Sequence, residues 1–158
     1  NFNSNKYISG VEGKHYLNKD ISVGLIANGS ERYFLDANRG RGHQDLFMEC
    51  LARLKVDGSV PLAQVLPNEW DHFGNSSVVV VITSSTETEW IHTLLKLSNK
   101  QMNVVIVFIK PESFQPGSSS DDILNLLSSK AVPSFVVSKG DDLGRVLSIP
   151  RRGSKLYA

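Results

Sequence analysis

The stretch SSVVVVITSSTETEWIHTLLKLSNKQMNVVIVFIK, residues 76–110, decides the fold. Its two apolar runs, 78–83 and 103–110, are continuous and do not alternate with polar residues, which predicts strands buried on both faces. Between them, apolar residues such as Trp90 and Leu94 recur at helical spacing. Strand, helix and strand in this order predict a βαβ unit, with 78–83 as a central strand of a parallel sheet.

The same alternation continues toward the C-terminus. A Pro/Gly/Ser loop leads to DDILNLLSSK (121–130), a predicted helix for which Ser120 is the expected N-cap. PSFVVSKG (133–140) predicts a last strand, and DDLGRVL (141–147) a final helical turn. Strands and helices that alternate over 77–147 indicate a largely parallel sheet with right-handed crossovers.

The N-terminal part reads differently. ISVGLIANG (21–29) and ERYFLDA (31–37) predict two strands joined by a tight hairpin turn. The loop RGRGHQ follows, and apolar spacing then predicts a helix over 45–56, with Gly58 suited to a left-handed C-terminal cap. Beyond it lies a short apolar segment closed by Pro67.

Length and composition favour one domain. The chain has 158 residues, of which 41% are hydrophobic, and a net charge of +1 that gives no field to attract nucleic acid or an anionic membrane. We expect an irregular lead-in over 1–20, with a short strand near KYIS, a single domain over 21–150 and a basic tail over 151–158. The pattern around Trp70 and Phe73 favours a small satellite core over an interface anchor.

The expected compartment is the cytoplasm. The single cysteine, Cys50, cannot form an internal disulfide, and its apolar setting favours a small buried residue over a reactive thiol. No apolar run approaches the roughly 20 residues that span a bilayer. Because the chain starts at Asn1 without an initiator Met, we expect a fragment, and a membrane segment upstream of it is an open alternative.

VGLIANG, RGRGHQDLFMECLARL and DDLGRVL give the chain a family resemblance over about residues 21–147. It resembles the C-terminal part of the domain of unknown function 58 family, bacterial and archaeal proteins related to the von Willebrand factor type A fold. The resemblance implies an α/β, doubly wound, mostly parallel Rossmann-like sheet with one antiparallel edge strand, here lacking the family's first strand. It also implies protein–protein interaction, with a MoxR-type ATPase as a possible partner, and membrane-spanning segments upstream.

The metal ligands of type A domains are missing from this sequence. Such domains bind Mg²⁺ through an Asp-x-Ser-x-Ser loop, a Thr and an Asp, because hard oxygen ligands must replace the water of the ion. The chain has no Asp-x-Ser-x-Ser, carries NRGRGHQ where the Thr is expected, and ends the strand 78–83 in Thr83-Ser84 where the pattern places Thr-Asp. We therefore predict no divalent-metal site and no cofactor.

Two polar segments remain as candidate sites for a partner or an anion. Ser84, Ser85 and Thr86 are more consistent with capping of a helix near Glu87, where Thr86 and Glu89 match a capping box, than with a nucleophile. His92 is expected on the flank of that helix. The second segment is the loop RGRGHQ before the predicted helix 45–56. Its candidate residues are Arg39, Arg41 and His43.

Two functions stay open. The first is a non-catalytic protein-interaction module that binds a MoxR-type ATPase or a second copy of itself through loops at the carboxyl edge of the sheet. The second is a small Rossmann-like enzyme or phosphate-binding domain that uses NRGRGHQ and TSST, since a glycine loop before a helix can hold phosphate. The missing first strand leaves a gap beside 78–83, to be filled by KYIS, by direct pairing of flanking strands or by another chain, and we favour the first two solutions over the third.

Overall fold

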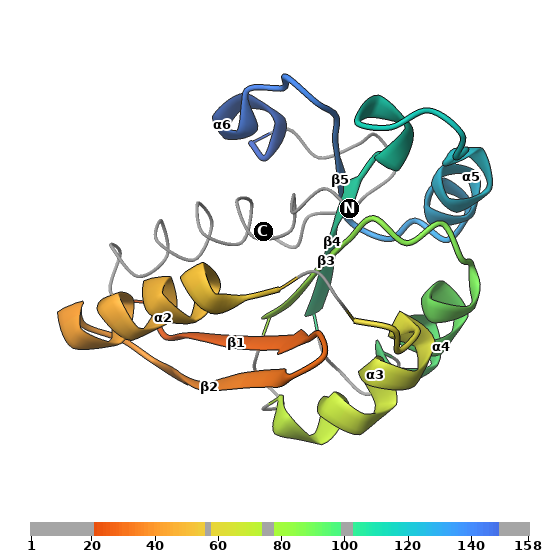
Figure 1. Ribbon diagram of the computed structural model, residues 1–158. Helices are drawn as coiled ribbons and strands as arrows, with labels where there is room; N and C mark the ends of the chain where they lie inside the picture. The colour runs from red at the N-terminus through yellow and green to blue at the C-terminus, as the bar shows by residue number, and fades with distance from the viewer. Residues whose placement is uncertain (1–20, 56–57, 74–77, 99–102, 149–158) are drawn as a thin grey trace. The chain divides into compact units, whose positions relative to one another are not determined.

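The computed structural model describes residues 21–55, 58–73, 78–98 and 103–148, which belong to two compact units, Asn1–Val60 and Pro61–Ala158. The first unit contains β1 (Val23–Asn28), β2 (Arg32–Asn38) and α2 (Arg41–Arg53) (Figure 1). The second contains, in chain order, α3 (Leu62–Glu69), η1 (Trp70–His72), β3 (Val78–Thr83), α4 (Glu89–Ser98), β4 (Asn103–Ile109), η2 (Pro111–Ser113), α5 (Asp121–Ser129), β5 (Ser134–Val137) and α6 (Leu143–Val146).

The predicted hairpin is confirmed in the first unit. Strands β1 and β2 pair antiparallel, with Asn28 opposite Arg32 across the turn. Helix α2 packs on one face of this pair through Phe47 and Leu51, which are 2% and 3% exposed. Burial of these two side chains holds the helix to a hairpin that would be marginally stable by itself.

The predicted ends of the helix after this hairpin are wrong. The helix was expected over 45–56 but begins at Arg41, because Gly40 takes φ +91° at the N-cap and turns the chain directly from β2 into α2. It ends at Arg53, since Leu54 is extended. Gly58 therefore caps nothing: a Cβ there would lie 2.7 Å from the carbonyl oxygen of Asn28, so glycine permits a close backbone approach to the hairpin turn.

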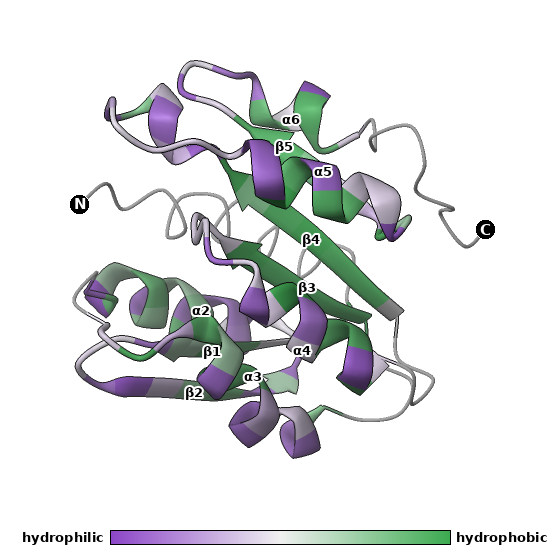
Figure 2. Ribbon diagram, turned by 90° about the vertical axis from the view of Figure 1, so that its right-hand side faces the viewer, coloured by the Kyte–Doolittle hydropathy of each residue, from purple (hydrophilic) through white to green (hydrophobic). Residues whose placement is uncertain are grey.

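The predicted βαβαβ order is confirmed in the second unit. Its sheet is parallel, in the order β3-β4-β5, and β4 is the central strand. Residues Ile106 to Ile109 of β4 are fully buried, as expected for a strand with neighbours on both sides and cover on both faces. Figure 2 shows the three strands as the most hydrophobic ribbons of this unit.

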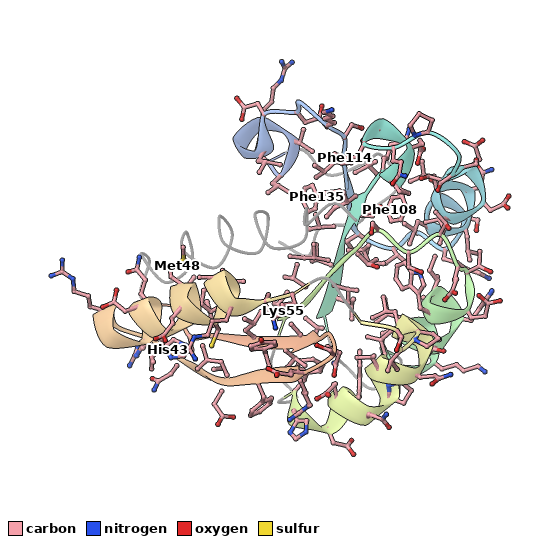
Figure 3. All side chains as sticks on the ribbon, in the orientation of Figure 1. His43, Met48, Lys55, Phe108, Phe114 and Phe135 are labelled. Carbon is pink, nitrogen blue, oxygen red and sulfur yellow. The ribbon has the colours of Figure 1, made fainter. Side chains whose placement is uncertain are left out.

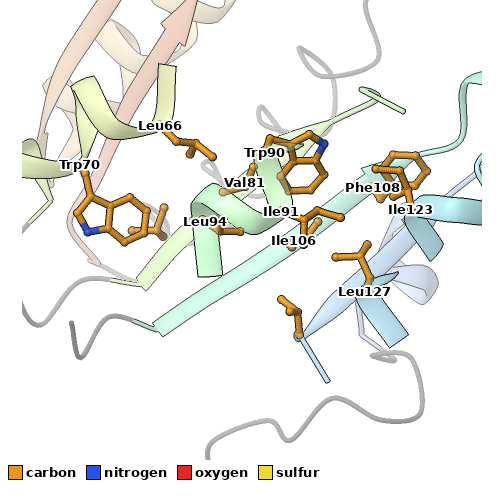
Figure 4. Packing of buried hydrophobic residues seen from close by; sticks show 12 residues of the cluster. Leu66, Trp70, Val81, Trp90, Ile91, Leu94, Ile106, Phe108, Ile123 and Leu127 are labelled. Atoms are coloured by element: carbon orange, nitrogen blue, oxygen red, sulfur yellow. The ribbon is translucent and has the colours of Figure 1, made fainter. Parts of the chain in front are cut away.

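The helices of the second unit are divided unequally between the two faces of the sheet. Helices α3, α4 and α5 pack on one face, whereas the short α6 lies on the other side, next to β5 (Figure 1). The main core lies under the three helices (Figure 4) and is made of these residues: Leu66, Trp70, Val79, Val81, Trp90, Ile91, Leu94, Ile106, Phe108, Ile123, Leu127 and Val132.

Helix α3 was not predicted from the sequence. The segment expected to be closed by Pro67 is a helix, Leu62–Glu69, that contains Pro67 in its interior. Proline costs helical stability there, and burial of Leu66 against α4 and the sheet compensates for it. Trp70 is 5% exposed and meets Phe73 edge to face at 5.8 Å, so the predicted core role of this pair is confirmed, within the main core and not a satellite.

The prediction that 78–83 is buried on both faces is wrong. Among the described residues, strand β3 has a neighbouring strand on one side only, and its burial alternates: Val79, Val81 and Thr83 are buried, whereas Val78 and Val80 are 59% and 38% exposed. The described residues thus form an α/β protein, compatible with a Rossmann-like fold, whose antiparallel strands make a separate hairpin. The expected KYIS strand lies outside the described residues.

Candidate functional site

The Ser/Thr loop after β3 turns back on itself and does not cap α4 as predicted. Thr83 Oγ1 accepts a hydrogen bond from the backbone N–H of Ser85 at 3.1 Å, and Ser85 Oγ accepts one from the N–H of Glu87 at 3.4 Å. Because α4 begins at Glu89, Thr86 lies too far before the first turn to form the capping box. These short side-chain bonds stabilise a turn.

The hydroxyls of this loop lack the partners that catalysis requires. Ser84 and Thr86 are exposed and Ser85 is half-buried. Within the described residues, no histidine, lysine or carboxylate side chain hydrogen-bonds to any of the three hydroxyls. His92 is exposed on the flank of α4, as predicted. A serine or threonine nucleophile needs a base within hydrogen-bond reach, so the loop is not an assembled catalytic centre.

The sheet itself provides no ligand crevice between its described strands. In open α/β sheets, ligands bind where the strand order reverses and adjacent loops separate to opposite faces. Here the chain advances from β3 to β4 to β5 in one direction, and both crossover helices, α4 and α5, pack on the same face. The loops after β3 and β4 therefore turn to the same side.

A charged network that the sequence did not reveal lies after β4. Ser120 is fully buried, and its Oγ donates a hydrogen bond of 2.5 Å to Glu112 Oε2, while Lys110 Nζ lies 3.3 Å from Glu112 Oε1. Ser120 occupies the N-cap position of α5, as predicted, but its hydroxyl does not bond the helix backbone. The eight-residue separation of Ser120 from Glu112 follows no short motif, so only the fold brings them together.

This network keeps Glu112 ionised. Burial raises the pKa of Glu112, but the hydrogen bonds from Ser120, the backbone and Lys110, together with the charge of Lys110, outweigh burial and lower the pKa below its usual value. Glu112 is thus paired with both Ser120 and Lys110. The network therefore holds the loop after β4 against the start of α5.

A second set of bonds ties the loop after β4 to the loop after β5. Ser113 Oγ donates to the carbonyl oxygen of Lys110 at 2.7 Å and accepts from the N–H of Lys139 at 3.0 Å. Asp141 Oδ2 accepts from the N–H of Ser138 at 2.7 Å. The polar groups at the carboxyl ends of β4 and β5 are thus engaged in loop structure.

The predicted Arg/His segment is divided by the structure. Arg39 and Arg41 are exposed on either side of the N-cap Gly40. His43 is only 8% exposed, and its Nε2 lies 2.7 Å from the carbonyl oxygen of Val23, between α2 and the hairpin (Figure 3). We therefore remove His43 from the candidate surface, because its ring joins the helix to β1. The prediction took His43 for a loop residue, whereas it lies in the first turn of α2.

Strand β3 presents an apolar surface at one edge of the described sheet. We call Val78–Thr83, with its exposed Val78 and Val80, the β3 edge. The strand has β4 as its neighbour on one side and no strand on the other side among the described residues. Its sequence, VVVVIT, contains no charged residue, proline or glycine. Such an edge is a template for pairing with another polypeptide.

Other kinds of site find no support in the part of the chain that the structure describes. No three His, Cys, Asp or Glu side chains are close enough there to hold a metal ion. No described helix is both long and apolar enough to cross a membrane. Cys50 is half-buried and unpaired with another cysteine.

Comparison with known proteins does not assign a family. No family model, curated protein or solved structure gives a significant match to the chain.

Proposed function

We propose that this chain is a non-catalytic protein-interaction module and that the β3 edge is its binding surface. Three observations together carry the proposal: β3 is at the end of its sheet among the described residues, two of its valines are exposed, and Val78–Thr83 contains no charge. Monomeric proteins usually protect such strands with charges, prolines or covering loops. A strand that carries neither charge nor proline is suited to bind a polypeptide.

The expected surroundings of the module come from its family resemblance. A member of the domain of unknown function 58 family, with a von Willebrand factor type A-like fold, would work on the cytoplasmic side with a MoxR-type ATPase as one candidate partner. Arg39 and Arg41 are exposed and form a second, basic contact region of this proposal. Exposed arginines at a rim mainly accelerate association and add salt dependence.

Site-specific photocrosslinking in the source cell tests the proposal. A photoreactive residue in place of Val80 should yield a covalent product with a protein, whereas the same residue in place of Leu46, which is 52% exposed on α2, should not. Leu46 is a matched control because it is also an exposed apolar side chain. A lack of protein adducts at position 80, with the protein folded and abundant, would refute the proposal.

A ligand screen tests the alternative of a phosphate- or nucleotide-binding domain. Thermal unfolding is followed with ATP, NADH and inorganic phosphate, because a ligand at 100 times its dissociation constant adds about 2.7 kcal/mol to the free energy of unfolding. We expect no shift in the melting temperature. A reproducible stabilisation by one of these compounds would favour the alternative.

A further inference from the structure

We infer that the β3 edge pairs antiparallel with the β3 edge of a second copy of this chain, which joins two three-stranded sheets into one continuous sheet. The inference rests on the proposed function and names the partner of that surface. It is carried by the side of β3 that has no neighbouring strand among the described residues, and by the residues that lie along it.

The backbone of β3 on the side away from β4 indicates that the occupant is a strand. In a strand, the N–H and C=O groups of consecutive residues point alternately to the two sides, and β3 is in register with β4 on one side along all six of its residues. Every second residue therefore directs its backbone groups away from β4. Another strand can satisfy these groups and at the same time cover the side chains beside them.

The side chains of β3 are complementary to themselves. An antiparallel pairing with Val80 opposite the same residue of the second copy places the exposed Val78 opposite the half-buried Ile82, on the same face of the joined sheet. All of these contacts join β-branched apolar residues, which form favourable cross-strand pairs. No like charges meet, because the strand has none.

Two-fold pairing also leaves no unprotected edge. Each copy would use β3 internally, and the outer strands of the joined sheet would be the two β5 strands. Strand β5 has only four residues, three of which are buried. A short, covered outer strand does not invite further addition, so the assembly stops at two copies.

Sedimentation velocity of the purified full chain is the test. We expect a concentration-dependent dimer whose dissociation constant is below roughly 1 mM, a value typical of weak specific association. Val80→Lys should weaken dimerisation roughly tenfold or more, since each copy carries a charge into the strand pair. Leu46→Lys, the matched control, should dimerise as the wild type does. Val78→Lys replaces Val80→Lys if the latter does not fold, because Val78 is more exposed.

Each outcome decides the inference. A wild-type chain that stays monomeric up to roughly 1 mM overturns it, as do folded Val78→Lys and Val80→Lys variants that dimerise like the wild type. If the chain is monomeric but a photoreactive residue at position 80 captures a different protein, the second copy is wrong and the interaction module stands. A dimer lost with a lysine at Val80 and retained with one at Leu46 supports the inference.

Discussion

The two outer strands of the three-stranded sheet differ in how they are protected. Strand β5 is four residues long, three of which are buried, with α5 on one face and α6 on the other. Strand β3 is six residues long, and its outward valines are exposed. Both are apolar strands at the end of one sheet, so sequence hydrophobicity alone does not distinguish them. The difference shows that exposure is decided by what covers a strand.

The largest expected effect comes from a charge in the protected strand. Val137 of β5 is 3% exposed and lies on the same face of the sheet as Val80. Val137→Lys should lower the free energy of unfolding by about 3 kcal/mol or more, because a buried ammonium would lack a partner. Chemical denaturation followed by circular dichroism measures this change. A loss of less than about 1 kcal/mol would show that β5 is as open as β3.

The second-largest effect on stability is expected from acid, which should weaken the Glu112 network after β4. The pKa of Glu112 is lowered in the folded chain, so its ionised form stabilises the fold above the unfolded-state value of about 4.5, and this stabilisation is lost as the pH falls through the folded value. Ser120→Ala removes a hydrogen bond to a charged group and should cost about 2 kcal/mol at neutral pH.

Denaturation of the wild type and of Glu112→Gln over a pH series checks this prediction. The wild type should lose more stability than the variant below about pH 4.5. Parallel pH profiles for the two proteins would show that the network after β4 contributes nothing to stability.

An equal charge in the open strand should have a much smaller effect on folding. Val80→Lys is expected to change the free energy of unfolding by about 0.5 kcal/mol at a protein concentration where the chain is monomeric, since the side chain already contacts water. The same denaturation experiment measures it. If Val80→Lys destabilises the monomer as much as Val137→Lys, then β3 is covered within a single chain and the comparison fails.

These contrasts show what sequence pattern can and cannot determine. The order of strands and helices from 78 to 146 was predictable, because continuous apolar runs and helical spacing depend on local sequence. The exposure of Val78 and Val80 was not, since an apolar strand looks the same at the centre and at the end of a sheet. Helix α3 was missed because Pro67 is a strong local signal against a helix, which burial of Leu66 and Trp70 outweighs.

The candidate site was less predictable than the fold. The exposed positions of Arg39 and Arg41 agree with expectation, whereas His43 is buried because α2 starts at Arg41, two residues before it. The Glu112–Ser120 contact depends on tertiary structure and has no sequence signature. A sequence pattern can therefore identify candidate polar residues, but the partners of these residues depend on how the loops pack.

The smallest effect on stability is expected at the basic residues of the first unit. Replacing both Arg39 and Arg41 with Glu should leave the free energy of unfolding within about 0.5 kcal/mol of the wild type. If the captured partner also contacts this region, its association should become slower and its salt dependence should change. Binding kinetics at several salt concentrations measure both. Identical kinetics in the double variant would exclude the two arginines from the contact surface.

No specific divalent-metal site is expected, because Ser84 stands where the type A pattern has a carboxylate and because Arg39 and Arg41 repel cations. Calorimetric titration with Mg²⁺, Mn²⁺ and Ca²⁺ should give no one-to-one binding. A sub-millimolar site for any of these ions would contradict the prediction.

Amide hydrogen exchange along β3 tests most directly whether this strand is an open edge that a second copy covers. At low protein concentration, every second amide from Val78 to Thr83 should be protected by β4, and the alternate amides should exchange quickly. Raising the concentration should slow the alternate amides in the wild type and in Leu46→Lys, but not in Val80→Lys. Uniform protection of all the β3 amides at the lowest concentration would contradict the account, because the edge would then be covered within one chain.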